Sequence, residues 1–131
     1  MKITTILSTT ALALLATSTS TLALGTNCRG KSECNSNGCQ LSDLEEQIAK
    51  LPTYKIFKPG QEIVCCTPGT TKGGRRGRLC AYTQHTKSEI PVLQLRHYVR
   101  NLGIHGCRRC GSFAFDGRDV YNGELTVNYR S

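Results

Sequence analysis

The sequence predicts an α+β fold: an α/β sandwich in which two helices pack on one face of an antiparallel sheet of about five strands, with disulfides fastening the layers. Three observations lead to this prediction. Two segments carry apolar residues at helical spacing, several short stretches are rich in β-branched residues, and the chain has eight cysteines in 131 residues. A chain of this length forms one small domain, which excludes a large multidomain enzyme.

The first 23 residues are typical of a secretory signal peptide. Lys2 precedes an apolar run from Ile6 to Leu15, and a stretch of small and polar residues follows as far as Ala23. The apolar run is shorter than the roughly 20 residues that a membrane span needs, which disfavours the alternative of a retained signal anchor. We therefore expect residues 1–23 to be removed and residues 24–131 to form a secreted, extracellular domain.

Eight cysteines in a short secreted chain favour a disulfide framework. The pair Cys107 and Cys110, with two arginines between them, also has the spacing of a redox motif or of half a zinc site. However, no second short knuckle completes a zinc site, and no thioredoxin-like β-α-β pattern surrounds the pair. We expect neither a metal nor a cofactor. Instead we expect this pair to bridge to the N-terminal pair Cys28 and Cys34, which would tie the start of the domain to a late segment.

The first helix is predicted between Ser42 and Leu51. Its leucines and isoleucine fall on one face at helical spacing. Ser42 as N-cap and Glu45 three residues later form a capping box, and Pro52 ends the helix. The opposite face is charged and is expected to be solvated.

A long hairpin is predicted next. Residues 61–66, QEIVCC, form a short strand whose alternation places Cys65 and Cys66 on opposite faces and gives them different partners. Residues 79–86, LCAYTQHT, form the returning strand. Between them, residues 67–78 have four glycines, one proline and no apolar residue that could anchor a core, so they are predicted to be an exposed loop. The loop is basic, and its cations are Lys72, Arg75, Arg76 and Arg78.

The second helix is predicted to start at Pro91, which suits a first turn, and to end at Gly103, which suits a left-handed C-cap. Apolar residues recur between them at helical spacing. The tail then contains a turn at Asp116-Gly117 and a hairpin signal at Asn122-Gly123 between β-rich flanks. These segments complete the set of about five short strands.

Four stretches of residues 24–131 together resemble a known family. They are LGTNCRGKSEC at 24–34, CAYTQHT at 80–86, NLGIHGCRRCGS at 101–112 and DVYNGELTVNY at 119–129. In this order, and over nearly the whole domain, they are similar to the KP-four type of fungal killer toxins. The resemblance implies a secreted α/β sandwich that inhibits the growth of susceptible fungi by blocking calcium entry and sometimes acts on plant cells. It does not imply an enzyme, and we expect no catalytic activity.

The resemblance also implies two bridges and a binding residue. The bridges of the family correspond here to Cys28–Cys107 and Cys34–Cys110. Arg78 occupies the position that engages the target channel in the family, where the type toxin has lysine. A guanidinium is a planar fork and an ammonium a compact charge, so this exchange need not be neutral at an acidic pore.

Four cysteines remain after this assignment, and they allow three connectivities. They are Cys39, Cys65, Cys66 and Cys80. A vicinal bridge between Cys65 and Cys66 is strained. Of the other two arrangements, we choose Cys39–Cys65 with Cys66–Cys80.

The expected partner is a calcium channel in the membrane of the target cell. The basic loop would be attracted to the carboxylates at the outer mouth of the channel, in a salt-dependent way. The alternative is that the loop is only a solubilising tip. We expect a monomer that binds no nucleic acid and does not insert into membranes.

Three other functions remain open. A secreted ribonuclease would use His85, His97 or His105 with Glu62 and an arginine for acid and base catalysis. A cationic membrane-disrupting protein is favoured by the net charge of +8, although neither helix has the Lys-rich and bulky apolar faces of an interfacial helix. A plant-directed effector would share the fold of the toxin.

Overall fold

The computed structural model describes residues 25–35, 38–68 and 77–131. The expected signal peptide, residues 1–23, lies outside the described residues, and so do Lys72, Arg75 and Arg76 of the basic loop. In chain order the described elements are η1 (Ser32–Asn35), α2 (Leu41–Ala49), β1 (Ile56–Phe57), β2 (Val64–Cys66), β3 (Arg78–Gln84), β4 (Ile90–Pro91), α3 (Val92–His105), β5 (Gly111–Ala114), η2 (Val120–Asn122) and β6 (Glu124–Arg130).

The larger sheet is antiparallel and has the strand order β2-β3-β6-β5. Its two central strands pair along their whole length, from Arg78 opposite Arg130 to Gln84 opposite Glu124. Because side chains alternate along a strand, the fully buried Leu79 and its neighbours of the same parity belong to the core. The residues between them form the outer face of the sheet.

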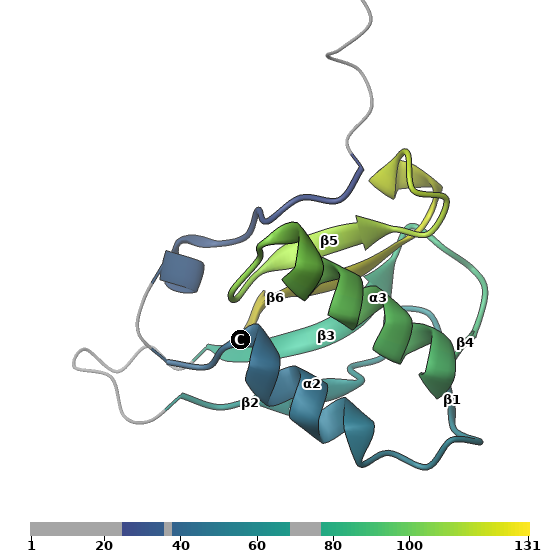
Figure 1. The fold of residues 1–131 in the computed structure, drawn as a ribbon, viewed down its shortest axis with the longest axis horizontal. Coiled ribbons are helices and arrows are strands. Elements are labelled where there is room, and N and C mark those ends of the chain that lie inside the picture. The colour runs from purple at the N-terminus through teal and green to yellow at the C-terminus, as the bar shows by residue number, and fades with distance from the viewer. Residues whose placement is uncertain (1–24, 36–37, 69–76) are drawn as a thin grey trace, which may run out of the picture.

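Both helices cover the same face of this sheet, as Figure 1 shows. Leu44 and Ile48 of α2 and Leu95, Val99 and Leu102 of α3 are almost completely buried between the two layers. Each such side chain contributes on the order of 2 kcal/mol through the hydrophobic effect. The predicted α+β sandwich, with two helices on one sheet face, is confirmed.

The start of α2 differs from the prediction. The helix begins at Leu41, and its first backbone N–H donates to the carbonyl of Arg108 at 2.8 Å. The Asp43 carboxylate accepts the backbone N–H of Gln40, also at 2.8 Å. The predicted capping box of Ser42 and Glu45 is therefore wrong, because a tertiary contact to the segment before β5 lets the helix start one residue before Ser42.

The end of α3 also differs from the prediction. Gly103 lies inside the last turn, and Gly106 is the left-handed C-cap, with φ of 106°. The N–H of Gly106 donates to the carbonyl of Gly103, and that of Cys107 to the carbonyl of Leu102. Either glycine satisfies the sequence pattern, but only Gly106 turns the chain directly into the Cys107 bridge.

A second sheet, of two short strands, was not predicted. Ile56 pairs with Pro91 and Phe57 with Ile90. Strands of two residues have no hydrophobic period, so the pattern of the sequence does not reveal them.

The turn between β5 and β6 is longer than the predicted Asn122-Gly123 hairpin. It runs from Phe115 to Gly123 and includes the short helix η2. Asp116 organises it, since one carboxylate oxygen accepts the backbone N–H groups of Arg118 and Asp119 at 2.8 and 3.0 Å. The prediction of a turn at Asp116-Gly117 is confirmed, and Gly117 has φ of 74° there.

Candidate functional site

Two of the four bridges fasten the start of the domain to the segment around β5. They are Cys28–Cys107 and Cys34–Cys110, the pairs that the family resemblance implies. Next to them, Asn27 forms a β-bridge with Ser112 on the outer edge of β5. The former candidate redox pair, Cys107 and Cys110, therefore holds the N-terminal segment against the sheet, and none of the described cysteines is free. We call these two bridges the N-terminal staples.

The other two bridges correct the sequence-based choice. They are Cys39–Cys66 and Cys65–Cys80, instead of Cys39–Cys65 with Cys66–Cys80. The reason is the register of the hairpin, which places Cys65 directly opposite Cys80 on the outer face of the sheet. Cys66 then points to the helix face and reaches Cys39, just before α2. The prediction that Cys65 and Cys66 face opposite sides with different partners is confirmed.

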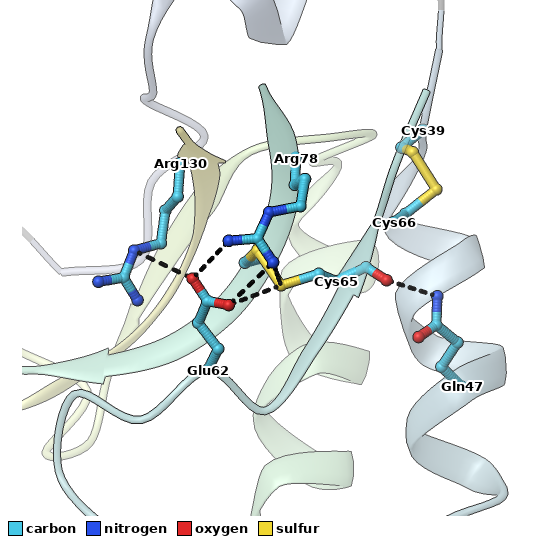
Figure 2. The surroundings of a disulfide bond; sticks show 8 residues. Cys39, Gln47, Glu62, Cys65, Cys66, Arg78 and Arg130 are labelled. Carbon is cyan, nitrogen blue, oxygen red and sulfur yellow. Dashed lines mark hydrogen bonds and ion pairs between the residues drawn. A yellow bond between two sulfur atoms is a disulfide. The ribbon is translucent and has the colours of Figure 1, made fainter. Parts of the chain in front are cut away.

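The sequence placed Arg78 in the basic loop, but in the structure Arg78 is the first residue of β3. Its guanidinium forms a two-pronged ion pair with Glu62, with Nη1 and Nη2 each 3.1 Å from a carboxylate oxygen (Figure 2). The Sγ atom of Cys65 lies 3.7 Å from Nη1 and 3.4 Å from Glu62 Oε1. The ion pair thus lies against the disulfide that closes the loop.

A second arginine approaches the same carboxylate. Arg130 at the end of β6 places Nε 3.7 Å from Glu62, and its guanidinium lies 4.4 Å from the ring centroid of Tyr82. Two cations thus face one anion on the outer face of the sheet, and about a third of each side chain is exposed. We call this cluster the loop base; its members are Glu62, Cys65, Arg78, Cys80 and Arg130.

The loop base fixes both ends of the basic loop. Residues 67–77 connect β2 to β3 in the sequence, and the Cys65–Cys80 bridge joins these two strands. On the helix side, Gln47 of α2 donates to the carbonyl of Cys65 at 3.1 Å, and the Cys39–Cys66 bridge fastens the same strand a second time (Figure 2). The two strands that flank residues 67–77 are therefore held together at this edge of the sheet.

The loop base contains atoms that could bind a metal, but these atoms already have other partners. Glu62, Cys65 and Cys80 bring potential ligand atoms within 4.8 Å of one another. Both sulfurs are consumed by the disulfide, and the carboxylate is already paired with arginines. In the oxidised protein this cluster is therefore structural.

The residues proposed for ribonuclease chemistry do not form one cluster in the described part of the chain. Glu62 is bound by Arg78 and Arg130. His85 instead binds the nearly buried Glu124, with Nδ1 2.6 Å from a carboxylate oxygen. His97 contacts Asn101 on its own helix, and His105 is the last residue of α3.

Sequence reasoning missed the contribution of Arg130 and the role of Glu62 as an anchor for Arg78. A search for acidic residues at the start of the preceding strand would have found Glu62. No local signal points to Arg130, because only the pairing of β3 with β6 brings it opposite Arg78.

None of the helices in the described ranges is long and apolar enough to span a membrane.

In comparisons with known proteins, the Kp4 family model matches residues 11–131. The KP4 killer toxin of Ustilago maydis P4 virus is 35% identical over 117 residues, an alignment that covers 82% of this chain and 80% of the toxin.

Proposed function

This chain belongs to the Kp4 family of killer toxins, and we propose that it is secreted and inhibits competing fungi by blocking a calcium channel through its basic loop. The family membership confirms the resemblance found in the four sequence stretches. It supports a toxin that acts by binding and not by catalysis.

The observation that carries the proposal is the reinforcement of the strands beside the basic loop, by the loop base and by the Cys39–Cys66 bridge. Two disulfides and one ion pair hold the strands on either side of residues 67–77. Such reinforcement lowers the entropy that a loop loses when it binds a partner. The enclosed segment contains three cations, Lys72, Arg75 and Arg76, in a glycine-rich context, which suits an acidic channel mouth.

The structure changes the expected role of Arg78. A guanidinium that already shares a carboxylate is partly neutralised, so we assign Arg78 to positioning the loop and the other three cations to contacting the channel. This division separates two sets of variants that sequence reasoning had grouped together.

The test is growth inhibition of several fungi, and of plant roots, with and without excess external calcium. The variant Lys72→Gln/Arg75→Gln/Arg76→Gln should lose inhibition and keep its melting temperature. The control Lys87→Gln/Arg108→Gln/Arg118→Gln removes the same charge from exposed positions elsewhere and should stay active. Equal growth inhibition by both variants would contradict the hypothesis that the loop contacts the channel.

Two further readouts separate the alternatives. Channel block predicts that added calcium relieves inhibition and that dye-loaded vesicles stay intact, whereas a membrane-disrupting protein releases the dye. Incubation with RNA should give no cleavage products, and cleavage would restore the ribonuclease hypothesis.

A further inference from the structure

The small β1–β4 sheet has an apolar face on each side. Its inner side chains, Phe57 and Ile90, are buried in the core. The outward pair is Ile56 and Pro91, both exposed. Since polar residues usually occupy the solvent side of such a strand pair, a second apolar face is unusual.

The same register continues by one residue at the start of α3. The N–H of Val92 donates to the carbonyl of Lys55 at 3.0 Å, and Val92 is fully buried. Two further exposed apolar side chains follow closely along the chain: Tyr54, two residues before Ile56, and Leu93, two residues after Pro91 in the first turn of α3; they are 84% and 59% exposed. Together with Ile56 and Pro91 these residues form what we call the apolar face: Tyr54, Ile56, Pro91 and Leu93.

The surroundings of the apolar face are positive. Lys55 and Lys58 are exposed and flank β1 in the chain, and one exposed acid, Glu89, directly precedes β4. The first turn of α3 has no acidic residue, and its N-cap, Pro91, offers no side-chain cap, so the partial positive charge of the helix end is not offset. Exposed aliphatic side chains, a tyrosine and flanking lysines are the combination that favours an anionic bilayer surface.

The small size of the face argues against a second copy of the chain as its occupant. A stable protein interface takes about 20–30 residues from each partner, and the apolar face has four. A shallow contact with lipid headgroups and the upper acyl chains needs no such area, because every exposed side chain gains independently from the transfer.

We propose that the apolar face docks the protein on anionic lipid bilayers, as a peripheral contact that precedes and does not require channel binding. Figure 1 shows β1 and β4 at one end of the domain and the start of β3, with the C-terminus, at the other. The strand that carries part of the apolar face and the strand that begins at Arg78 thus lie at opposite ends, so docking through the apolar face leaves the loop base free for a partner that protrudes from the membrane.

The test is co-sedimentation of the protein with vesicles of phosphatidylcholine alone or of equal parts phosphatidylcholine and phosphatidylserine. The variant Tyr54→Ser/Ile56→Ser should bind the anionic vesicles about tenfold more weakly or worse, since it removes two apolar side chains from the contact. Its matched control is Tyr121→Ser/Ile104→Ser, which removes the same two residue types from positions that are 71% and 75% exposed. The control should bind like the parent.

A fluorescence reporter keeps the proposal testable if the serine variant folds poorly. The chain has no tryptophan, so Leu93→Trp and Ile104→Trp each give a single emitter. Anionic vesicles should shift the emission of Leu93→Trp to shorter wavelength and leave that of Ile104→Trp unchanged.

Three outcomes overturn the proposal. One is no sedimentation with anionic vesicles. Another is binding that survives in Tyr54→Ser/Ile56→Ser but disappears in Lys72→Gln/Arg75→Gln/Arg76→Gln, which would mean attachment through the loop. The last is an emission shift that depends on protein concentration without vesicles, which would show self-association. None of these depends on whether the protein blocks a channel.

Discussion

The N-terminal staples and the loop base use disulfides for different purposes. Cys28–Cys107 and Cys34–Cys110 span 79 and 76 residues and join the start of the domain to the segment before β5. Cys65–Cys80 spans 15 residues and joins neighbouring strands that already pair through their backbones. The two long bridges therefore restrict the unfolded chain most strongly. The short Cys65–Cys80 bridge instead fixes the two strands on either side of the basic loop.

The two regions also differ in the polar contacts that are made around them. Around the staples, polar contacts are made by backbone groups and amides: the N–H of Lys31 donates to Asn128, and Asn27 exchanges backbone bonds with Ser112. At the loop base, two arginines share Glu62. The contacts around the staples are thus uncharged, whereas those of the loop base are ion pairs.

The largest expected effect comes from removing one bridge of each kind. In the chain-entropy model, loss of the 76-residue bridge in Cys34→Ser/Cys110→Ser costs about 4.5 kcal/mol, and loss of the 15-residue bridge in Cys65→Ser/Cys80→Ser about 3 kcal/mol. Chemical unfolding of the two double variants measures both. The comparison fails if the order is reversed, or if Cys65→Ser/Cys80→Ser keeps full growth inhibition.

Alanine at a glycine tests the same contrast on a smaller scale. A Cβ on Gly111 would lie 2.6 Å from the backbone oxygen of Asn27 and 2.9 Å from Cys107 Sγ, both fixed by the N-terminal staples. A Cβ on Gly77 would lie 2.9 Å from the ring of the buried Tyr129, and its nearest neighbours all belong to that one side chain and not to the backbone. We expect Gly111→Ala to lose about 1–3 kcal/mol and Gly77→Ala less, as melting temperatures will show. Equal losses would mean that both regions are equally rigid.

The sequence predicted the layers better than the contacts between them. Alternation in QEIVCC was enough to separate the faces of Cys65 and Cys66, since the period of a strand is local. Their partners depend on which residue of β3 stands opposite each, and the register is set by the whole hairpin and its packing. For the same reason the composition of residues 67–78 predicted a loop but did not show that Arg78 pairs with Glu62.

The ends of the helices illustrate the same limit. Ser42 and Gly103 satisfy local capping rules, but the helices begin at Leu41 and end at His105. In each case a group distant in sequence, or the need to reach a disulfide, decided between equivalent local choices. The sequence therefore predicted which segment carries the candidate site. The residues that anchor this segment could be identified only from the fold.

Neutralising Glu62 should have a small effect on stability and a larger one on activity. In Glu62→Gln two arginines lose their shared carboxylate, but the side chains are about one-third exposed, so solvent screening keeps the cost near or below about 1 kcal/mol. Growth inhibition should fall more than the melting temperature, because Arg78 no longer holds the base of the loop.

Arg78→Gln provides the matching test, and the double variant Glu62→Gln/Arg78→Gln completes a double-mutant cycle. If Glu62 and Arg78 act as one unit, the double variant should be no less active than either single variant. Additive losses would show instead that Arg78 contacts the target directly.

The smallest expected effect is on acid stability, and it tests whether the sheet edge at the staples depends on charge at all. In the turn that follows β5, hydrogen bonds from the backbone N–H groups of Asp119 and Arg118 and from the Asn122 side chain lower the pKa of Asp116 below its usual 3.8. A lowered pKa means that this carboxylate stabilises the fold above pH 3.8 and that the contribution is lost as the pH falls through the folded value.

Asp116→Asn keeps an acceptor oxygen for the turn but cannot ionise, so its melting temperature should fall less than that of the parent between neutral and acidic pH. Because Asp116 is fully exposed, the gap should be small beside the loss caused by opening a staple. Parallel melting curves down to the lowest pH would show that this carboxylate contributes nothing, and a gap as large as that of Cys34→Ser/Cys110→Ser would contradict the view that covalent links dominate this edge of the sheet.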